Sequence, residues 1–185
     1  MNDPKSSGLV DPAALRSLDR TLQRYPEAAR GFCEELHEEH WAEAAWLYER
    51  RESLEEQRSS VALAAWADVE SRAAAHVDAL AVGGSMVAEQ WVARGLAGEP
   101  GELHTALRLA CRAAEQEPLL ELLAGLKEAE PAWLLAAEDA LAWELPADRT
   151  PLVEALMSAL TDAANDPALG VLTRVIGRRR WPLER

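Results

Sequence analysis

A helix opening recurs in the second half of this chain at an interval of 33 residues. Residues 118–126 read PLLELLAGL and residues 151–160 read PLVEALMSAL, and each copy is followed by a second helix that opens with proline, at Pro131 or Pro167. Proline is tolerated in the first turn of a helix, where the backbone N–H groups have no partner within the helix. A period of this length is typical of paired-helix repeats, which bury their apolar faces only by stacking on neighbours. The pattern predicts short antiparallel helices in a stacked array.

The composition favours helices throughout the chain. There are 36 alanines and 28 leucines but only 10 valines and one isoleucine. Unbranched side chains lose little rotamer freedom in a helix, whereas β-branched side chains favour strands. We therefore predict an all-α protein in which an N-terminal helical bundle is followed by a short HEAT-like helix-pair array, an α-solenoid.

Glycine, proline and serine mark the expected boundaries. Residues 1–10 are polar and predict a flexible N-terminus, and residues 98–101 read GEPG, which separates a bundle over 11–98 from repeats over 99–185. Within the bundle we expect helices over about 11–24, from Tyr25-Pro26 onward, from Ser59-Ser60 to Gly83, and from Ser85 to residue 98. The array is expected to end in a capping helix, because arginines gather before Pro182.

The charge is negative and unevenly distributed. Thirty-two acidic and 19 basic side chains give a formal net charge of −13, which would repel a nucleic acid backbone. Ten of the acids lie between Glu27 and Glu56, whereas arginines gather in the last dozen residues. Two interpretations stay open: a solvated acidic helix face with a frayed basic tail, or an end that docks on a charged partner.

The sequence predicts a cytoplasmic protein. Cys33 and Cys111 are its two cysteines and have neither a disulfide framework nor metal-ligand spacing. The first residues lack the apolar core of a signal peptide, and no run of 18 apolar residues could span a membrane. The oligomeric state is not predicted.

No motif in the chain predicts catalysis, a cofactor or a metal site. His37 and His40 stand three residues apart in HEEHW, one residue short of the spacing in the zinc-protease motif HExxH. Neighbouring acids such as Glu138 and Asp139 are interpreted as solvated charges, because adjacent helical residues point in different directions. A metal-dependent enzyme that uses His37, His40 and nearby glutamates remains the third hypothesis, after two that involve protein binding.

Seven tryptophans stand beside a single phenylalanine and two tyrosines. Tryptophan fills large gaps between alanine-rich helices and also anchors protein interfaces. Trp66 and Trp91 lie on apolar stripes and are expected in the core. Trp133, just after the start of a helix, and Trp181, near the end of the chain, are the candidates for contact with a partner.

Two segments resemble a family of bacterial HEAT-repeat proteins whose molecular function is poorly defined. The first, VESRAAAHVDALAVGG over residues 69–84, is similar to that family's helix signature, and the second, HWAEAAWLYERR over residues 40–51, is similar to its histidine-led EAAFLW segment. The matching residues in the two segments are Arg72, Ala75, His76, Asp78, Leu80 and Gly84, and His40, Glu43, Ala44, Ala45, Leu47 and Tyr48.

The resemblance implies a binding role in the cytoplasm. Genes of that family often neighbour those of type VI secretion components and effectors, which implies an accessory or adaptor protein, and family members are commonly longer than this chain. The alternative is an immunity protein that binds and blocks a toxin, since an acidic surface suits a basic nuclease. Either hypothesis names a protein as the partner, and the matched His76 and Asp78 then fix helix packing or face a binding groove.

Overall fold

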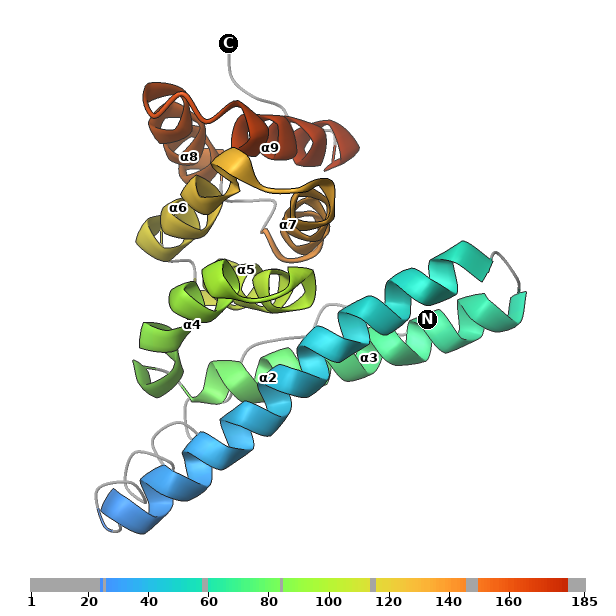
Figure 1. The fold of residues 1–185 in the computed structure, drawn as a ribbon, viewed down its shortest axis with the longest axis vertical. Helices are drawn as coiled ribbons and strands as arrows, with labels where there is room; N and C mark the ends of the chain where they lie inside the picture. Colours follow the sequence, from blue (N-terminus) through green and yellow to red (C-terminus); the bar gives the residue numbers. More distant parts are fainter. Residues whose placement is uncertain are drawn as a thin grey trace.

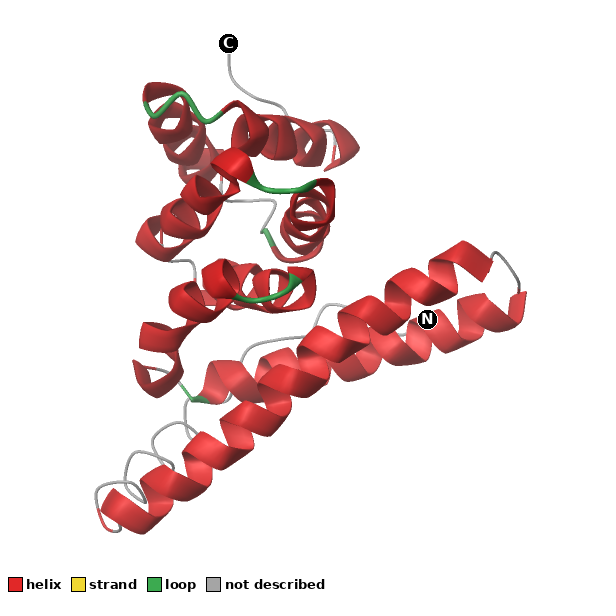
Figure 2. Ribbon diagram, viewed as in Figure 1, coloured by secondary structure: helices red, strands yellow, loops and turns green. Residues whose placement is uncertain are grey.

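The computed structural model describes residues 24, 26–57, 60–83, 85–113, 116–145 and 150–179. These residues are almost entirely helical, and no strand occurs among them (Figure 2). The prediction of an all-α protein is confirmed. The expected flexible segment 1–10 and most of the helix expected over 11–24 lie outside the described residues.

A long antiparallel hairpin leads the fold. Helix α2 (Pro26–Gln57) and helix α3 (Ser60–Val82) lie side by side over much of their length and project away from the remaining helices (Figure 1). Leu47, Leu54, Val69 and Ala73 form a small apolar cluster between them. The starts of α2 and α3 and the end of α3 before Gly83 agree with the boundaries predicted from proline, serine and glycine.

The remaining helices stack in two layers. Helices α4, α6 and α8 form one layer, and α5, α7 and α9 form the other (Figure 1). Their bounds are Ser85–Ala97 for α4, Pro100–Ala113 for α5, Gln116–Ala124 for α6, Pro131–Glu144 for α7, Thr150–Asp162 for α8 and Asp166–Arg179 for α9. The helix openings that recur after 33 residues are α6 and α8, and these helices pack on each other within one layer.

Helix α5 lies at the centre of the molecule. It contacts α2, α3, α4, α6 and α7, and every residue from Leu103 to Cys111 is buried. A helix buried on all sides has no polar face toward solvent. Helix α4, which precedes the predicted domain boundary at residue 98, packs on α5 and α6, which follow it.

The repeat helices differ from the expected regular pattern at α6. This helix begins at Gln116, two residues before Pro118, and has only nine residues before a 3₁₀ turn over Gly125–Glu128. Proline at the third position costs no hydrogen bond, because the first N–H groups of a helix are unpaired. The buried Asn165 amide then donates to the carbonyls of Leu123 (3.1 Å) and Ala124 (3.2 Å), while its side-chain oxygen accepts from the N–H of Ala168 (3.3 Å). One side chain thus joins the end of α6 to the start of α9.

Candidate functional site

Two sets of side chains in the described part of the chain are candidates for a functional site. One set is buried where the hairpin meets α5 and α7, and we call it the buried ion network: Arg51, Glu70, His104, Arg108, Arg112, Asp139 and Glu144. The other set is exposed along α2 on the side away from α5, and we call it the outer α2 face: Phe32, Glu35, Glu39, Glu43, Trp46 and Glu49.

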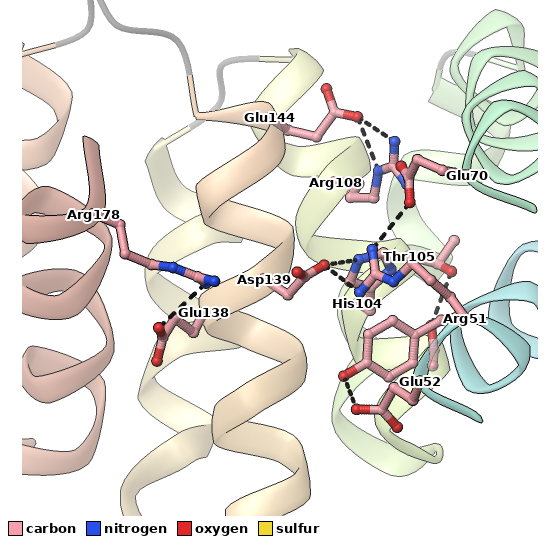
Figure 3. A network of polar contacts seen from close by, with 12 residues as sticks. Arg51, Glu52, Glu70, His104, Thr105, Arg108, Glu138, Asp139, Glu144 and Arg178 are labelled. Atoms are coloured by element: carbon pink, nitrogen blue, oxygen red, sulfur yellow. Dashed lines mark hydrogen bonds and ion pairs between the residues drawn. The ribbon is translucent and has the colours of Figure 1, made fainter. Parts of the chain in front are cut away.

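Glu70 of α3 is the centre of the buried ion network. One carboxylate oxygen accepts from Arg51 of α2 at 3.0 Å and the other from Arg108 of α5 at 3.1 Å (Figure 3). The side chain of Arg108 is only 2% exposed. A buried charge is tolerated when it is paired and hydrogen-bonded, and each of these groups is. The network therefore ties both hairpin helices to α5.

Asp139 extends the same network to α7. Its carboxylate accepts from Arg51 at 2.5 Å and lies 3.1 Å from Nε2 of His104 (Figure 3). His104 also packs against the ring of Tyr48, with 4.4 Å between the ring centroids. Burial, opposed by the hydrogen bond with Asp139, lowers the pKa of His104 to about 4. The imidazole is therefore neutral at pH 7 and donates to the carboxylate.

Glu144 closes the network at the other end of α7. It accepts from Arg108 at 2.9 Å and from Arg112 at 2.7 Å, and Arg112 also pairs with Asp78 of α3. Burial raises the pKa of Glu144, but the hydrogen bond from Arg112 and the two positive charges outweigh this and leave the pKa lowered. The lowered pKa values of Asp139 and Glu144 favour their anionic forms beside the arginines, an arrangement that suits structural support.

The buried ion network was not predicted from the sequence. The interpretation of Glu138 and Asp139 as solvated charges is wrong, because Asp139 faces the hairpin while Glu138 pairs with Arg174 and Arg178 of α9. Helix α7 is packed on both sides, so adjacent positions meet different neighbours. A sequence signal exists in α5, where His104, Arg108 and Arg112 recur every four positions among mostly apolar residues.

The outer α2 face combines acidic and aromatic side chains. Phe32 is 65% exposed and Trp46 is 51% exposed, and the glutamates between and beyond them are exposed as well. Their spacing of three or four residues places them along one side of the helix. Because an α-helix rises about 1.5 Å per residue, this face, from Phe32 to Glu49, runs for roughly 25 Å.

A small hollow lies at the junction of α2, α3 and α4. Its volume is about 200 Å³, and it is lined by Glu34, His37, Glu38, Trp41, Leu80, Gln90 and Arg94. The guanidinium of Arg94 lies 4.7 Å from the centroid of the Trp41 ring and pairs with Glu38. The hollow thus extends the acidic character of α2 toward α4.

The residues singled out from the sequence lie in separate surroundings. His76 lies beside His40, with 2.9 Å between the two Nδ1 atoms, whereas Asp78 pairs with Arg112. Trp133 is half-buried, and its indole N–H donates to the carbonyl of Gly98 at 3.3 Å. Their predicted role in binding a partner stays a prediction, and Trp181 lies outside the described residues.

The described arginines near the end of the chain do not form a frayed tail. Arg174 and Arg178 pair with Glu138, and Arg179 donates to the carbonyls of Ala142 and Leu145. The last two acceptors lie at the end of α7, where backbone carbonyls lack partners within the helix. These side chains attach α9 to α7.

No family model, curated protein or solved structure matches this chain. Among the described residues, no helix is long and apolar enough to cross a membrane. The same residues contain no group of three or more histidine, cysteine, aspartate or glutamate side chains arranged to hold a metal ion.

Proposed function

We propose that this protein is a non-enzymatic scaffold that binds another protein through the outer α2 face. The observation that carries the proposal is the exposure of Phe32 and Trp46 among glutamates on a long helix. Exposed aromatic side chains are the usual anchors of protein interfaces, and complementary charge around them selects the partner and speeds its association. The partner is therefore a protein with a basic surface and apolar pockets.

The arrangement of the remaining helices supports a scaffold role. We propose that α4 to α9 form a short HEAT-like solenoid, since paired helices stack in two layers and the openings that recur after 33 residues share a layer. The buried ion network holds the hairpin on this stack through four helices. A rigid support of this kind lowers the entropy lost when a partner binds.

We further propose a cytoplasmic accessory or adaptor role in type VI secretion. This rests on the resemblance of residues 40–51 and 69–84 to HEAT-repeat proteins encoded beside secretion genes. The acidic outer α2 face favours one alternative, an immunity protein that covers the basic surface of a nuclease toxin. A metal-dependent enzyme receives less support, because His37 and His40 have no arranged third ligand among the described residues.

Binding should be measured with the purified products of the neighbouring genes by titration calorimetry. Trp46→Ala is expected to weaken binding at least tenfold, as for an interface anchor. Leu135→Ala is the control, because Leu135 is also exposed (57%) but belongs to α7 and not to the outer α2 face. Equal losses in both variants, or none in Trp46→Ala, would contradict the proposed surface.

The two roles differ in what binding does to the partner. If the partner is a nuclease, one equivalent of the immunity protein abolishes its activity in a plasmid-cleavage assay, whereas an adaptor leaves the activity unchanged. Raising the salt concentration from 50 to 500 mM should weaken the complex in either case, because the exposed charges are screened. Binding that is insensitive to salt would argue against the acidic face.

A further inference from the structure

Two histidines from different helices meet in the hairpin. His40 of α2 and His76 of α3 are half-buried, their Nδ1 atoms are 2.9 Å apart, and their rings are inclined at 58° with centroids 5.1 Å apart. The residues are 36 positions apart in the sequence, and the antiparallel packing of α2 on α3 brings them together. Both ring nitrogens are thus held in place by the packing of long helices.

The distance between the two Nδ1 atoms indicates which coordination geometry they would offer to a metal ion. For bonds of about 2.0–2.1 Å to one metal ion, two nitrogens 2.9 Å apart subtend an angle of about 90°. A tetrahedral zinc ion would need the two nitrogens about 3.3–3.4 Å apart. A right angle between nitrogen ligands is typical of square-planar or tetragonal sites, which favour Cu²⁺ and Ni²⁺.

We propose that Nδ1 of His40 and Nδ1 of His76 bind one Cu²⁺ or Ni²⁺ ion between α2 and α3. Without metal, one imidazole donates its Nδ1 proton to the other. On binding, that imidazole carries its proton on Nε2 instead, so both Nδ1 lone pairs face the ion and no net proton is released. The hairpin would thus bind a metal ion in addition to its proposed role as a scaffold.

The surroundings of the two histidines are compatible with metal binding. Glu43 lies one turn after His40 and pairs with Arg72 at 3.7 Å, and both of these side chains are about half exposed. Such a pair is weak, so Glu43 is free to turn toward the ion and, with water, complete its coordination.

The test is a titration of untagged protein with NiCl₂ and with CuCl₂ at pH 7.5. One ion per chain is expected, and His40→Gln and His76→Gln should each weaken binding at least tenfold. His37→Gln is the matched control, because this histidine lies one turn before His40 and is expected to change the affinity less than twofold. Cu²⁺ should bind at least tenfold more tightly than Zn²⁺.

Several outcomes would overturn the proposal. They are wild-type affinity in both His40→Gln and His76→Gln, an equal loss in His37→Gln, or tighter binding of Zn²⁺ than of Cu²⁺ and Ni²⁺. Electron paramagnetic resonance of the wild-type copper complex provides a readout that needs no variant. Coupling to two nitrogens is expected, and coupling to none or to four would refute the two-histidine site.

Discussion

Replacing Glu70 by glutamine should destabilise the protein far more than replacing a glutamate at the surface. Glu70 is 8% exposed, and its two oxygens accept from Arg51 and Arg108, which are themselves buried. Glutamine has almost the same shape, but it removes the negative charge and turns an amide N–H₂ toward one of the arginines. Two buried cations then lose their shared anion.

The size of this loss of stability depends on which ion pairs Arg51 and Arg108 keep. Removing one member of a buried ion pair costs about 3–5 kcal/mol. Arg51 keeps Asp139 and Arg108 keeps Glu144, so we expect a loss near the lower limit, about 3 kcal/mol. Glu43→Gln is the matched control, because its pair with Arg72 is about half exposed and should contribute at most about 1 kcal/mol.

Urea denaturation followed by circular dichroism measures both variants. The free energy of unfolding in water should fall by about 3 kcal/mol for Glu70→Gln, with an unchanged dependence on urea concentration, so that only stability has changed. A decrease in the free energy of unfolding below about 1 kcal/mol, or one no larger than that of Glu43→Gln, would refute the conclusion that the network stabilises the packing of the hairpin on α5 and α7.

Three further predictions concern pH and backbone packing. Burial lowers the pKa of His104 from 6.5 to about 4, so that the unfolded chain binds a proton at a higher pH than the folded protein does. Up to about 3 kcal/mol of stability should therefore be lost as the pH falls from 6.5 to 4. The midpoint of urea denaturation should depend less on pH in His104→Gln than in the wild type, and an equal dependence would contradict this prediction. Gly101→Ala should lower the free energy of unfolding by about 1–3 kcal/mol, since the added Cβ would lie 2.4 Å from the Ala45 carbonyl oxygen. Gly177→Ala, where the added Cβ would have no neighbour within 4 Å, should raise it by about 0.5–1 kcal/mol. Melting temperatures that change in the same direction in both variants would disprove the close contact at Gly101. Ala164 has φ 51°, so Ala164→Gly should raise the melting temperature through a gain of about 1 kcal/mol, and a decrease would show that this backbone is unstrained.

The helical class and many helix boundaries follow from local sequence signals. Pro131 and Gly83 act on their own backbone or that of adjacent residues, so their effect can be read without knowing the fold. The abundance of alanine and leucine favours helices over strands for a similar reason, because rotamer freedom is lost residue by residue. The repeat of 33 residues likewise predicted that α6 and α8 are equivalent helices.

The contacts between polar residues, in contrast, depend on how the helices pack. Asp139 and Glu138 are neighbours in sequence, yet one faces Arg51 of the hairpin and the other faces α9. His40 and His76 are separated by 36 residues and meet because the hairpin has one particular register. Helical periodicity indicates which residues share a face, but the partner of that face depends on how whole helices pack, and this is set by the summed contacts of the core.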